Sequence, residues 1–182
     1  NASANALRIL LAQPGTWAEI VANPALIPNA VEECLRHSGP IAAWRRLATA
    51  DTEIGGVMIP KGAKLLIASA SANHDERRFE NPDALDLYRD NSTEHLTFGY
   101  GSHQCMGKNI GRMELRIFVD ELTRRLPHLR LAEQAFEYPA NVSFRGPKAV
   151  WVEWDTALNP ATPRAPIDFP IGPPERQSIT RQ

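Results

Sequence analysis

The sequence predicts a mainly helical protein with small β-sheets, an α+β chain, and three observations favour this class. Apolar residues recur at spacings of three and four after Gly107, as they do along one side of a helix. Two β-rich runs flank a turn signal within residues 53–68. The chain has 182 residues, of which 43% are hydrophobic and 23% charged, and this suits about one globular domain.

The first third of the chain carries the signals of three helices, expected over residues 6–12, 16–21 and about 26–36. Thr16 is placed to cap the second helix. Pro28 fits only in the first turn of the third helix, and Gly39, which proline follows, ends that helix.

A β-region follows. Residues 53–59 and 64–68 flank Pro60-Lys61-Gly62, which predicts that these two runs pair as a hairpin. Residues 73–97 are irregular and polar, and a connection of this length is usually functional or disordered. After it, a long helix is expected from Gly107 until Pro127 stops it.

The end of the chain changes character. Residues 142–144 and 149–154 read as short strands joined by a turn at 145–148. Six of the fifteen prolines follow Asn159, which predicts an extended linker rather than a packed element. We therefore expect a folded part over 1–155 and a proline-rich tail over 156–182.

Composition excludes several classes of protein. A net charge of −1 and a pI near 6.6 argue against nucleic-acid or anionic-membrane partners, and no apolar run approaches the length of a membrane span. Two cysteines, Cys34 and Cys105, are too few for a disulfide framework or a zinc cage, so we expect a reducing cytoplasm. The first residues contain neither methionine nor a signal peptide, so a fragment is expected.

The most informative segment is Phe98-Gly99-Tyr100-Gly101-Ser102-His103-Gln104-Cys105-Met106-Gly107, just before the long helix. Its glycines make the backbone pliable. A cysteine at the start of a helix lies near unpaired N–H groups that favour a thiolate, which is a good soft metal ligand. On these residues alone, a buried cysteine beside a glycine-rich turn is the competing interpretation.

This decapeptide is similar, at every fixed position, to the haem-binding loop of the cytochrome P-450 family, Phe-Gly-x-Gly-x-His-x-Cys-x-Gly. The resemblance implies the C-terminal portion of the cytochrome P-450 fold. It also implies that Cys105 is the catalytic residue and the axial thiolate ligand of a haem b (iron protoporphyrin IX) iron. By the same resemblance His103 contacts a haem propionate and Phe98 packs beside the cysteine, while the remaining cofactor-binding positions are Gly99, Gly101 and Gly107.

Two further segments resemble the same family. Glu33 and Arg36 have the Glu-x-x-Arg form of its buried structural ion pair, on neighbouring turns of a helix. The arginine that the family carries in the following meander falls here on Ala84, so the third partner stays open between Arg89 and Arg78. Arg46 corresponds to a second contact with a haem propionate. The resemblance implies a substrate pocket formed by Ile41, Ala42, Ala43, Trp44, Val142, Ser143 and Phe144, although core packing is nearly as good an interpretation of the two aromatic residues.

The resemblance implies a haem-thiolate monooxygenase. Such an enzyme inserts one atom of O2 into a small apolar substrate with electrons from a redox partner. The proline-rich tail resembles the linker of self-sufficient members, in which NAD(P)H delivers electrons through a fused reductase with flavin and iron–sulfur centres. Two alternatives remain at this point: a haem-thiolate peroxygenase or sensor, and an inactive structural fragment that binds no haem. Activity of this chain on its own is not expected.

Overall fold

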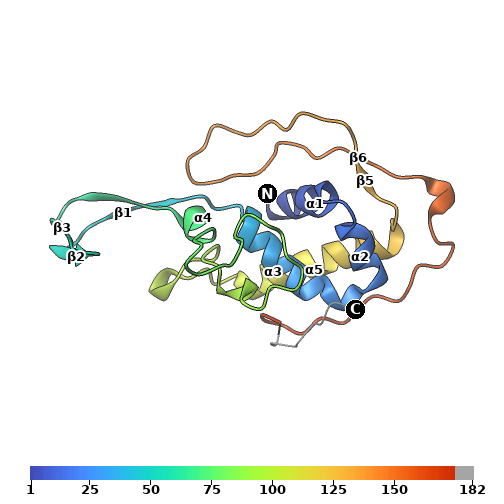
Figure 1. Ribbon diagram of the computed structural model, residues 1–182, viewed down its shortest axis with the longest axis horizontal. Coiled ribbons are helices and arrows are strands. Elements are labelled where there is room, and N and C mark those ends of the chain that lie inside the picture. The colour runs from blue at the N-terminus through green and yellow to red at the C-terminus, as the bar shows by residue number, and fades with distance from the viewer. Residues whose placement is uncertain (175–182) are drawn as a thin grey trace.

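A computed structural model describes residues 1–174 as a mainly helical fold with small antiparallel sheets, which confirms the predicted class (Figure 1). The α-helices are α1 (Ala2–Ala12), α2 (Thr16–Ala22), α3 (Ile27–Ser38), α4 (Ser69–Ala72) and α5 (Lys108–Arg125). The strands are β1 (Trp44–Leu47), β2 (Thr52–Ile54), β3 (Val57–Ile59), β4 (Lys64–Ile67), β5 (Arg130–Leu131) and β6 (Val152–Glu153). Short 3-10 turns are η1 (Pro24–Leu26), η2 (Ser92–Glu94), η3 (Gly101–His103) and η4 (Thr156–Leu158). None of the helices over this range is long and apolar enough to cross a bilayer.

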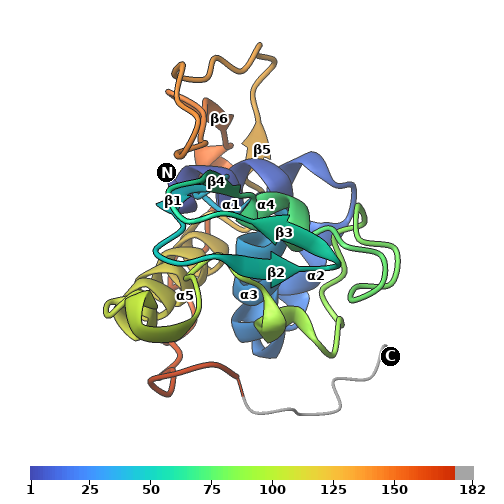
Figure 2. The same cartoon turned by 90° about the vertical axis from the view of Figure 1, so that its left-hand side faces the viewer.

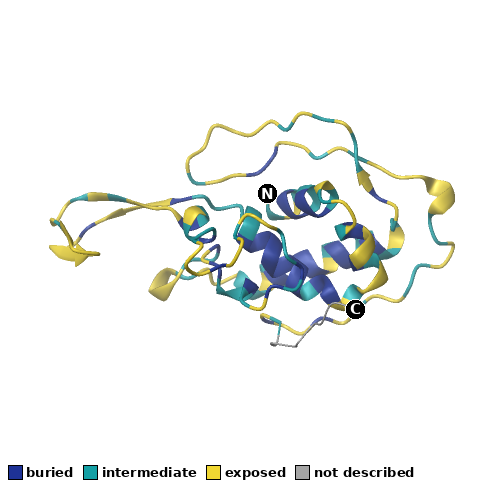
Figure 3. Cartoon of the chain, viewed as in Figure 1, coloured by how far each residue is buried: buried dark blue, intermediate teal, exposed yellow. Residues whose placement is uncertain are grey.

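Helix α3 is the centre of the fold. Most of its residues are buried, and α1 and α5 pack against it (Figure 3). As expected, Pro28 lies in its first turn and Gly39 follows its last residue. A Cβ on Gly39 would lie 2.6 Å from the carbonyl oxygen of Leu35 and 2.7 Å from Thr97 Oγ1, so only glycine allows this close approach. One expectation is wrong in detail, because Gly15, with φ of 83°, occupies the N-cap position of α2, and Thr16 is the first residue of the helix.

The predicted hairpin is wrong in its pairing. Strand β2 pairs with β3 across the two-residue turn Gly55-Gly56, and β4 pairs with β1. The two glycines have φ of 57° and 79°, the left-handed values that a tight hairpin turn needs and that glycine adopts without strain. Gly62 does lie in a turn, where its N–H donates to the carbonyl of Ala48 (2.8 Å), but the strands on its two sides have other partners. These strands form an arm that projects from the helices (Figure 1).

The predicted pairing near the C-terminus is also wrong. Residues 142–144 do not pair with 149–154; instead Phe144 forms an isolated bridge with Ile41, and β6 pairs with β5. The sequence pattern identified the strand-forming residues but carried no information on their partners. Phe144 lies more than a hundred residues from Ile41 along the chain, and β6 lies about twenty residues from β5.

Helix α5 confirms the predicted helix, but its apolar stripe is only partly buried: Phe118 and Leu122 pack against the core, whereas other members of the stripe face outward. Ile110 and Ile117 are 67% and 48% exposed. The buried face combines apolar residues with charged ones, namely Arg112, Leu115, Arg116, Val119, Asp120 and Thr123. Charged residues are rarely buried unless they are paired. The partners of these three therefore decide how the helix packs.

The tail also departs from expectation, since part of it packs. We call residues 164–171 the strap. Phe169 in the strap is only 8% exposed and belongs to the hydrophobic core, and Ile167 packs against the same core. The strap runs below α5 at the red end of the chain (Figures 1 and 2). Residues 175–182 of the predicted tail lie outside the described residues.

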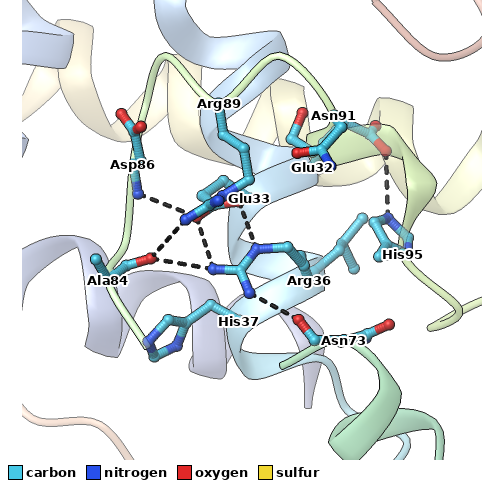
Figure 4. A network of polar contacts seen from close by, with 12 residues as sticks. Glu32, Glu33, Arg36, His37, Asn73, Ala84, Asp86, Arg89, Asn91 and His95 are labelled. Atoms are coloured by element: carbon cyan, nitrogen blue, oxygen red, sulfur yellow. Dashed lines mark hydrogen bonds and ion pairs between the residues drawn. The ribbon is translucent and has the colours of Figure 1, made fainter. Parts of the chain in front are cut away.

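A buried ion cluster ties α3 to the irregular stretch 73–97 (Figure 4). The carboxylate of Glu33, which is 0% exposed, accepts hydrogen bonds from Arg36 (2.8 Å) and from Arg89 Nε (3.0 and 3.1 Å). The structure thus places Arg89, and not Arg78, beside Glu33; Arg78 pairs with Glu94. At the position where the family carries arginine, the backbone carbonyl of Ala84 accepts from both Arg36 and Arg89 (3.0 and 3.3 Å).

A second buried cluster, around Glu32, ties α3 to α5. Arg112 donates to both oxygens of Glu32 (2.8 to 3.0 Å), and His95 Nε2 lies 3.3 Å from Oε2. Burial by itself would raise the pKa of Glu32, but the hydrogen bonds from His95 and Arg112 outweigh it, so the pKa lies below its ordinary value of 4.5. Two successive residues of α3 therefore hold two different parts of the chain.

We expect Glu33→Gln to destabilise the full-length protein by about 3–5 kcal/mol, because it leaves two buried guanidinium groups without a counter-charge. Chemical denaturation measures this change. Glu137→Gln is the matched control, since Glu137 pairs with Lys148 at the surface and the loss should stay below about 1 kcal/mol. Equal losses in the two variants would contradict the structural role of Glu33.

The Glu32 cluster predicts a pH dependence. Because folding lowers the pKa of Glu32, its carboxylate stabilises the fold above pH 4.5, and this contribution is lost as pH falls below 4.5 toward the folded-state pKa. The stability difference between the natural protein and Glu32→Gln should therefore shrink over that range. Denaturation at a series of pH values tests this, with the exposed Glu76→Gln as control. A difference that stays constant through the acid range would rule the effect out.

Candidate functional site

The loop that carries Cys105 is folded by its own backbone. The N–H of Cys105 donates to the carbonyl of Phe98 (2.8 Å), which closes the loop. Gly99 and Gly101 have φ of 72° and 76°, values that favour glycine. Gly107 takes the N-cap position of α5, so Cys105 precedes the helix rather than lying in its first turn. The thiol of Cys105 is exposed, whereas Cys34 is buried, and burial raises the pKa of the Cys34 thiol.

The first residue of this loop, Phe98, contacts two members of the Glu32 cluster. The guanidinium carbon of Arg112 lies 4.8 Å from the ring centre of Phe98, and the ring of His95 lies 5.6 Å from it. Both partners of Phe98 thus also contact Glu32. The position of the loop relative to α3 is fixed by charge as well as by packing.

The residues just before Phe98 are fixed by hydrogen bonds. Asn73, 1% exposed, donates to Thr97 Oγ1 (2.9 Å) and accepts from the N–H of Leu96 (2.7 Å). Thr97 Oγ1 in turn donates to the carbonyl of Leu35 (2.7 Å). This connects the loop to the end of α3 at the point where Gly39 allows close approach.

The thiol of Cys105 faces a cavity of about 740 Å³. Its lining is formed by Pro40, Ile41, Trp44, Arg46, Thr97, Phe98, Gly99, Tyr100, His103 and Cys105. Of the four residues 41–44 expected to line a pocket, Ile41 and Trp44 line this cavity. Ala43 is buried instead, and Ala42 lines a second, more polar cavity between α1 and α3.

Strand β1 presents two of the predicted side chains to this cavity. Trp44 and Arg46 are two residues apart, so they lie on one face of the strand, and Arg45 lies on the other. Within residues 1–174 Arg46 forms no ion pair; its one hydrogen bond goes to the carbonyl of Arg45 (2.9 Å). Arg46 and His103 are both exposed at the cavity. A guanidinium in this state is available to an anionic group.

The structure brings the second predicted pocket segment next to the first. The N–H of Ala42 donates to the carbonyl of Ser143 (2.7 Å), and the rings of Trp44 and Phe144 meet edge to face, 5.5 Å apart. Val142 is exposed beside them. Residues 142–144 thus support Trp44 at the rim of the cavity although they do not line it.

These residues fit a haem group better than a bare metal ion. In the part of the chain that the structure describes, no three His, Cys, Asp or Glu side chains gather in a way that could hold a metal ion. Cys105 is therefore not part of such a cluster among the described residues. The cavity lies within the range of about 300–1,000 Å³ usual for ligand sites, and its lining combines one thiol, one imidazole, one guanidinium and the hydroxyl-bearing side chains of Thr97 and Tyr100 with apolar walls. That donor set suits a flat apolar ring with an iron and anionic edges.

Sequence reasoning missed the supports of the loop. Glu32, His95 and Arg112 were not identified as a cluster, and Asn73 was noted only as part of an irregular stretch. One signal was present: Arg112 and Arg116 lie one turn apart on a helix that otherwise packs against the core, and buried arginines need a carboxylate. The adjacent acids of α3 were candidates for that role.

The sequence of residues 16–137 matches the family model described as Cytochrome P450. Among its relatives, the 20-oxo-5-O-mycaminosyltylactone 23-monooxygenase of Streptomyces fradiae is 45% identical over 122 residues. The match covers 67% of this chain and 29% of that relative. The chain therefore spans about a third of the length of the relatives it matches.

Two solved structures share the fold. The CYP116B5 heme domain of Acinetobacter radioresistens is 65% identical with a TM-score of 0.83, over 85% of this chain and 37% of that one. An intact type IV self-sufficient cytochrome P450 monooxygenase is 62% identical with a TM-score of 0.88, over 93% of this chain and 23% of that one. With the family match over two thirds of the sequence, a fold shared at this identity and a cysteine loop facing a haem-sized cavity, this chain belongs to the cytochrome P450 family.

Proposed function

We propose that this chain is the C-terminal part of the haem-binding domain of a self-sufficient cytochrome P450 monooxygenase. The observation that carries the proposal is the cavity in which the Cys105 thiol, His103 and Arg46 meet apolar walls. The names of the relatives support it, since they include a 23-monooxygenase and an intact self-sufficient monooxygenase. Residues 1–155 would belong to the haem-binding domain, and 156–182 would lead out of it.

Each residue of the site has a proposed role. When bound, haem b supplies the redox chemistry in which O2 takes up two electrons and two protons, one oxygen atom enters the substrate and the other leaves as water. Cys105 would hold the iron as a thiolate ligand, and its negative charge would donate electron density to the iron. Arg46 and His103 would pair with the propionates, where a guanidinium can form two parallel hydrogen bonds with a carboxylate. Gly99, Gly101 and Gly107 would let the backbone of the loop approach the cofactor closely, because none of them carries a Cβ.

The substrate would be a small apolar organic molecule. Ile41 and Trp44 present apolar surface to the cavity, and Phe144 holds the indole of Trp44 in place by its edge-to-face contact. Such walls exclude water from the reacting centre and orient the substrate by shape.

The electron source would be a reductase fused after the tail, with flavin and iron–sulfur centres that take electrons from NAD(P)H. The intact self-sufficient enzyme matches 93% of this chain, against 85% for the separate heme domain of another relative, so the likeness extends further when the rest of the protein is present. We place the protein in the cytoplasm, since Cys34 and Cys105 are both free thiols.

Reduction followed by carbon monoxide tests the axial ligand. The full-length protein should show a strongly red-shifted haem band, because the thiolate donates electron density to the iron, and Cys105→Ser should lose it. Cys34→Ser is the control, as its sulfur is buried in the core. A red-shifted band that survives in Cys105→Ser would refute the assignment of the ligand.

Haem retention tests Arg46. Arg46→Ala should release haem to a scavenger roughly 10- to 100-fold faster, because a charge-assisted hydrogen bond is worth about 1.5–3 kcal/mol. Arg45→Ala removes the same charge from the other face of β1 and should leave the rate unchanged. Equal rates in both variants would mean that Arg46 does not hold the cofactor.

A further inference from the structure

The strap is held on α5 by a buried carboxylate. Asp120 is only 2% exposed, and each of its oxygens has a partner in the strap. Its Oδ1 accepts from Arg164 Nη2 (2.5 Å), and its Oδ2 accepts from the N–H of Ile167 (3.2 Å). Arg164 also donates to Thr123 Oγ1, one turn further along α5 (3.2 Å). Without the strap this carboxylate would be left facing an apolar core without a counter-charge.

A second anchor lies one turn earlier on α5. Arg116 is 0% exposed, and its Nη1 donates to the carbonyl of Pro170 in the strap (2.9 Å). Its Nε and Nη2 have no hydrogen-bond partner in residues 1–174, and Nη2 lies 3.6 Å from Glu32. The strap thus supplies the one hydrogen bond of a buried cation. Phe169, between these contacts in the sequence of the strap, packs into the hydrophobic core.

This arrangement differs from that of a connection that only spans a distance. A flexible linker needs no buried contacts, and its reach follows from its length and composition. Here two charged residues of α5 are buried, and the docked strap provides hydrogen-bond partners to both: Arg164 and Ile167 to Asp120, and Pro170 to Arg116. Prolines suit such a segment, since each lacks an N–H that would need a partner on the helix.

We propose that the strap is an anchor that fixes, on α5, the point at which the chain leaves the haem-binding part. The segment that docks on α5 is the chain's own strap, residues 164–171. Resting on the proposed function, the anchor would hold the following electron-donating domain in a defined position relative to the Cys105 loop, because both attach to one helix. Asp120 lies roughly 20 Å along α5 from Gly107, at 1.5 Å per residue.

The test compares two neighbouring carboxylates of α5 in the full-length, haem-loaded protein. Asp120→Asn removes the charge that faces the strap. Glu121→Gln removes a charge whose partners are Arg124 and Arg125, away from the strap, and serves as the matched control. The first readout is amide hydrogen exchange in the peptide that contains Ile167. The second is the rate at which NAD(P)H reduces the haem.

Exchange in the natural protein should be slow, Asp120→Asn should accelerate it about 10-fold or more, and Glu121→Gln should not change it. Haem reduction should slow at least about fivefold in Asp120→Asn only, because a freed connection lowers the effective concentration of the donor. Exchange at α3 amides verifies that the core stays folded. If Asp120→Asn does not fold, Arg164→Gln removes the partly exposed partner from the strap side and should give the same two changes.

Two results would overturn the anchor: fast exchange at Ile167 already in the natural protein, or unchanged haem reduction once the strap is released. Failure of the proposed function looks different. A natural protein without the red-shifted carbon monoxide band, or without any reduction by NAD(P)H, would refute the fused monooxygenase, whereas the exchange readout would still report on docking.

Discussion

Two adjacent carboxylates on the central helix organise the rest of this structure. Glu32 and Glu33 follow each other on α3, so they point about 100° apart around the helix axis and reach different partners. Glu33 holds Arg36 and Arg89, and through them the irregular stretch before the cysteine loop. Glu32 holds Arg112 and His95, which contact the ring of Phe98 at the start of that loop. The start of the loop is thus fixed in two ways by one helix.

Burying so many charges is a poor route to stability, because removal from water costs about as much as pairing returns. The buried charges instead determine how the chain segments are positioned relative to one another. An apolar core tolerates small slips, whereas a guanidinium with defined carboxylate and carbonyl partners accepts only one position of each chain segment. The same principle extends along α5 to Arg116 and Asp120, whose partners come from the strap. The irregular stretch 73–97, the cysteine loop and the strap are therefore each held in a defined position against α3 and α5.

The sequence predicted local features better than distant ones. The helices, the end of α3 at Gly39 and the cysteine loop follow from capping, proline and glycine chemistry, which act over a few residues. Two predicted strand pairings are wrong, because β-rich runs do not encode their partners. The hairpin turn lies at Gly55-Gly56 and not at Pro60-Lys61-Gly62. The buried face of α5 escaped prediction because its arginines and Asp120 count as surface residues until their partners are known. The composition of the tail predicted an extended backbone but not the docking of Phe169, which depends on a core formed elsewhere.

The two cysteines differ in how accessible they are to oxidants. Cys34 is enclosed by the core, whereas Cys105 stands exposed at an open cavity. Peroxide and other oxidants attack accessible sulfur first, and oxidation beyond the sulfenic acid is irreversible for most proteins. The neighbouring Met106 is fully exposed and would oxidise to a sulfoxide in the same setting. Of these two free thiols, oxidation would therefore reach Cys105 well before Cys34.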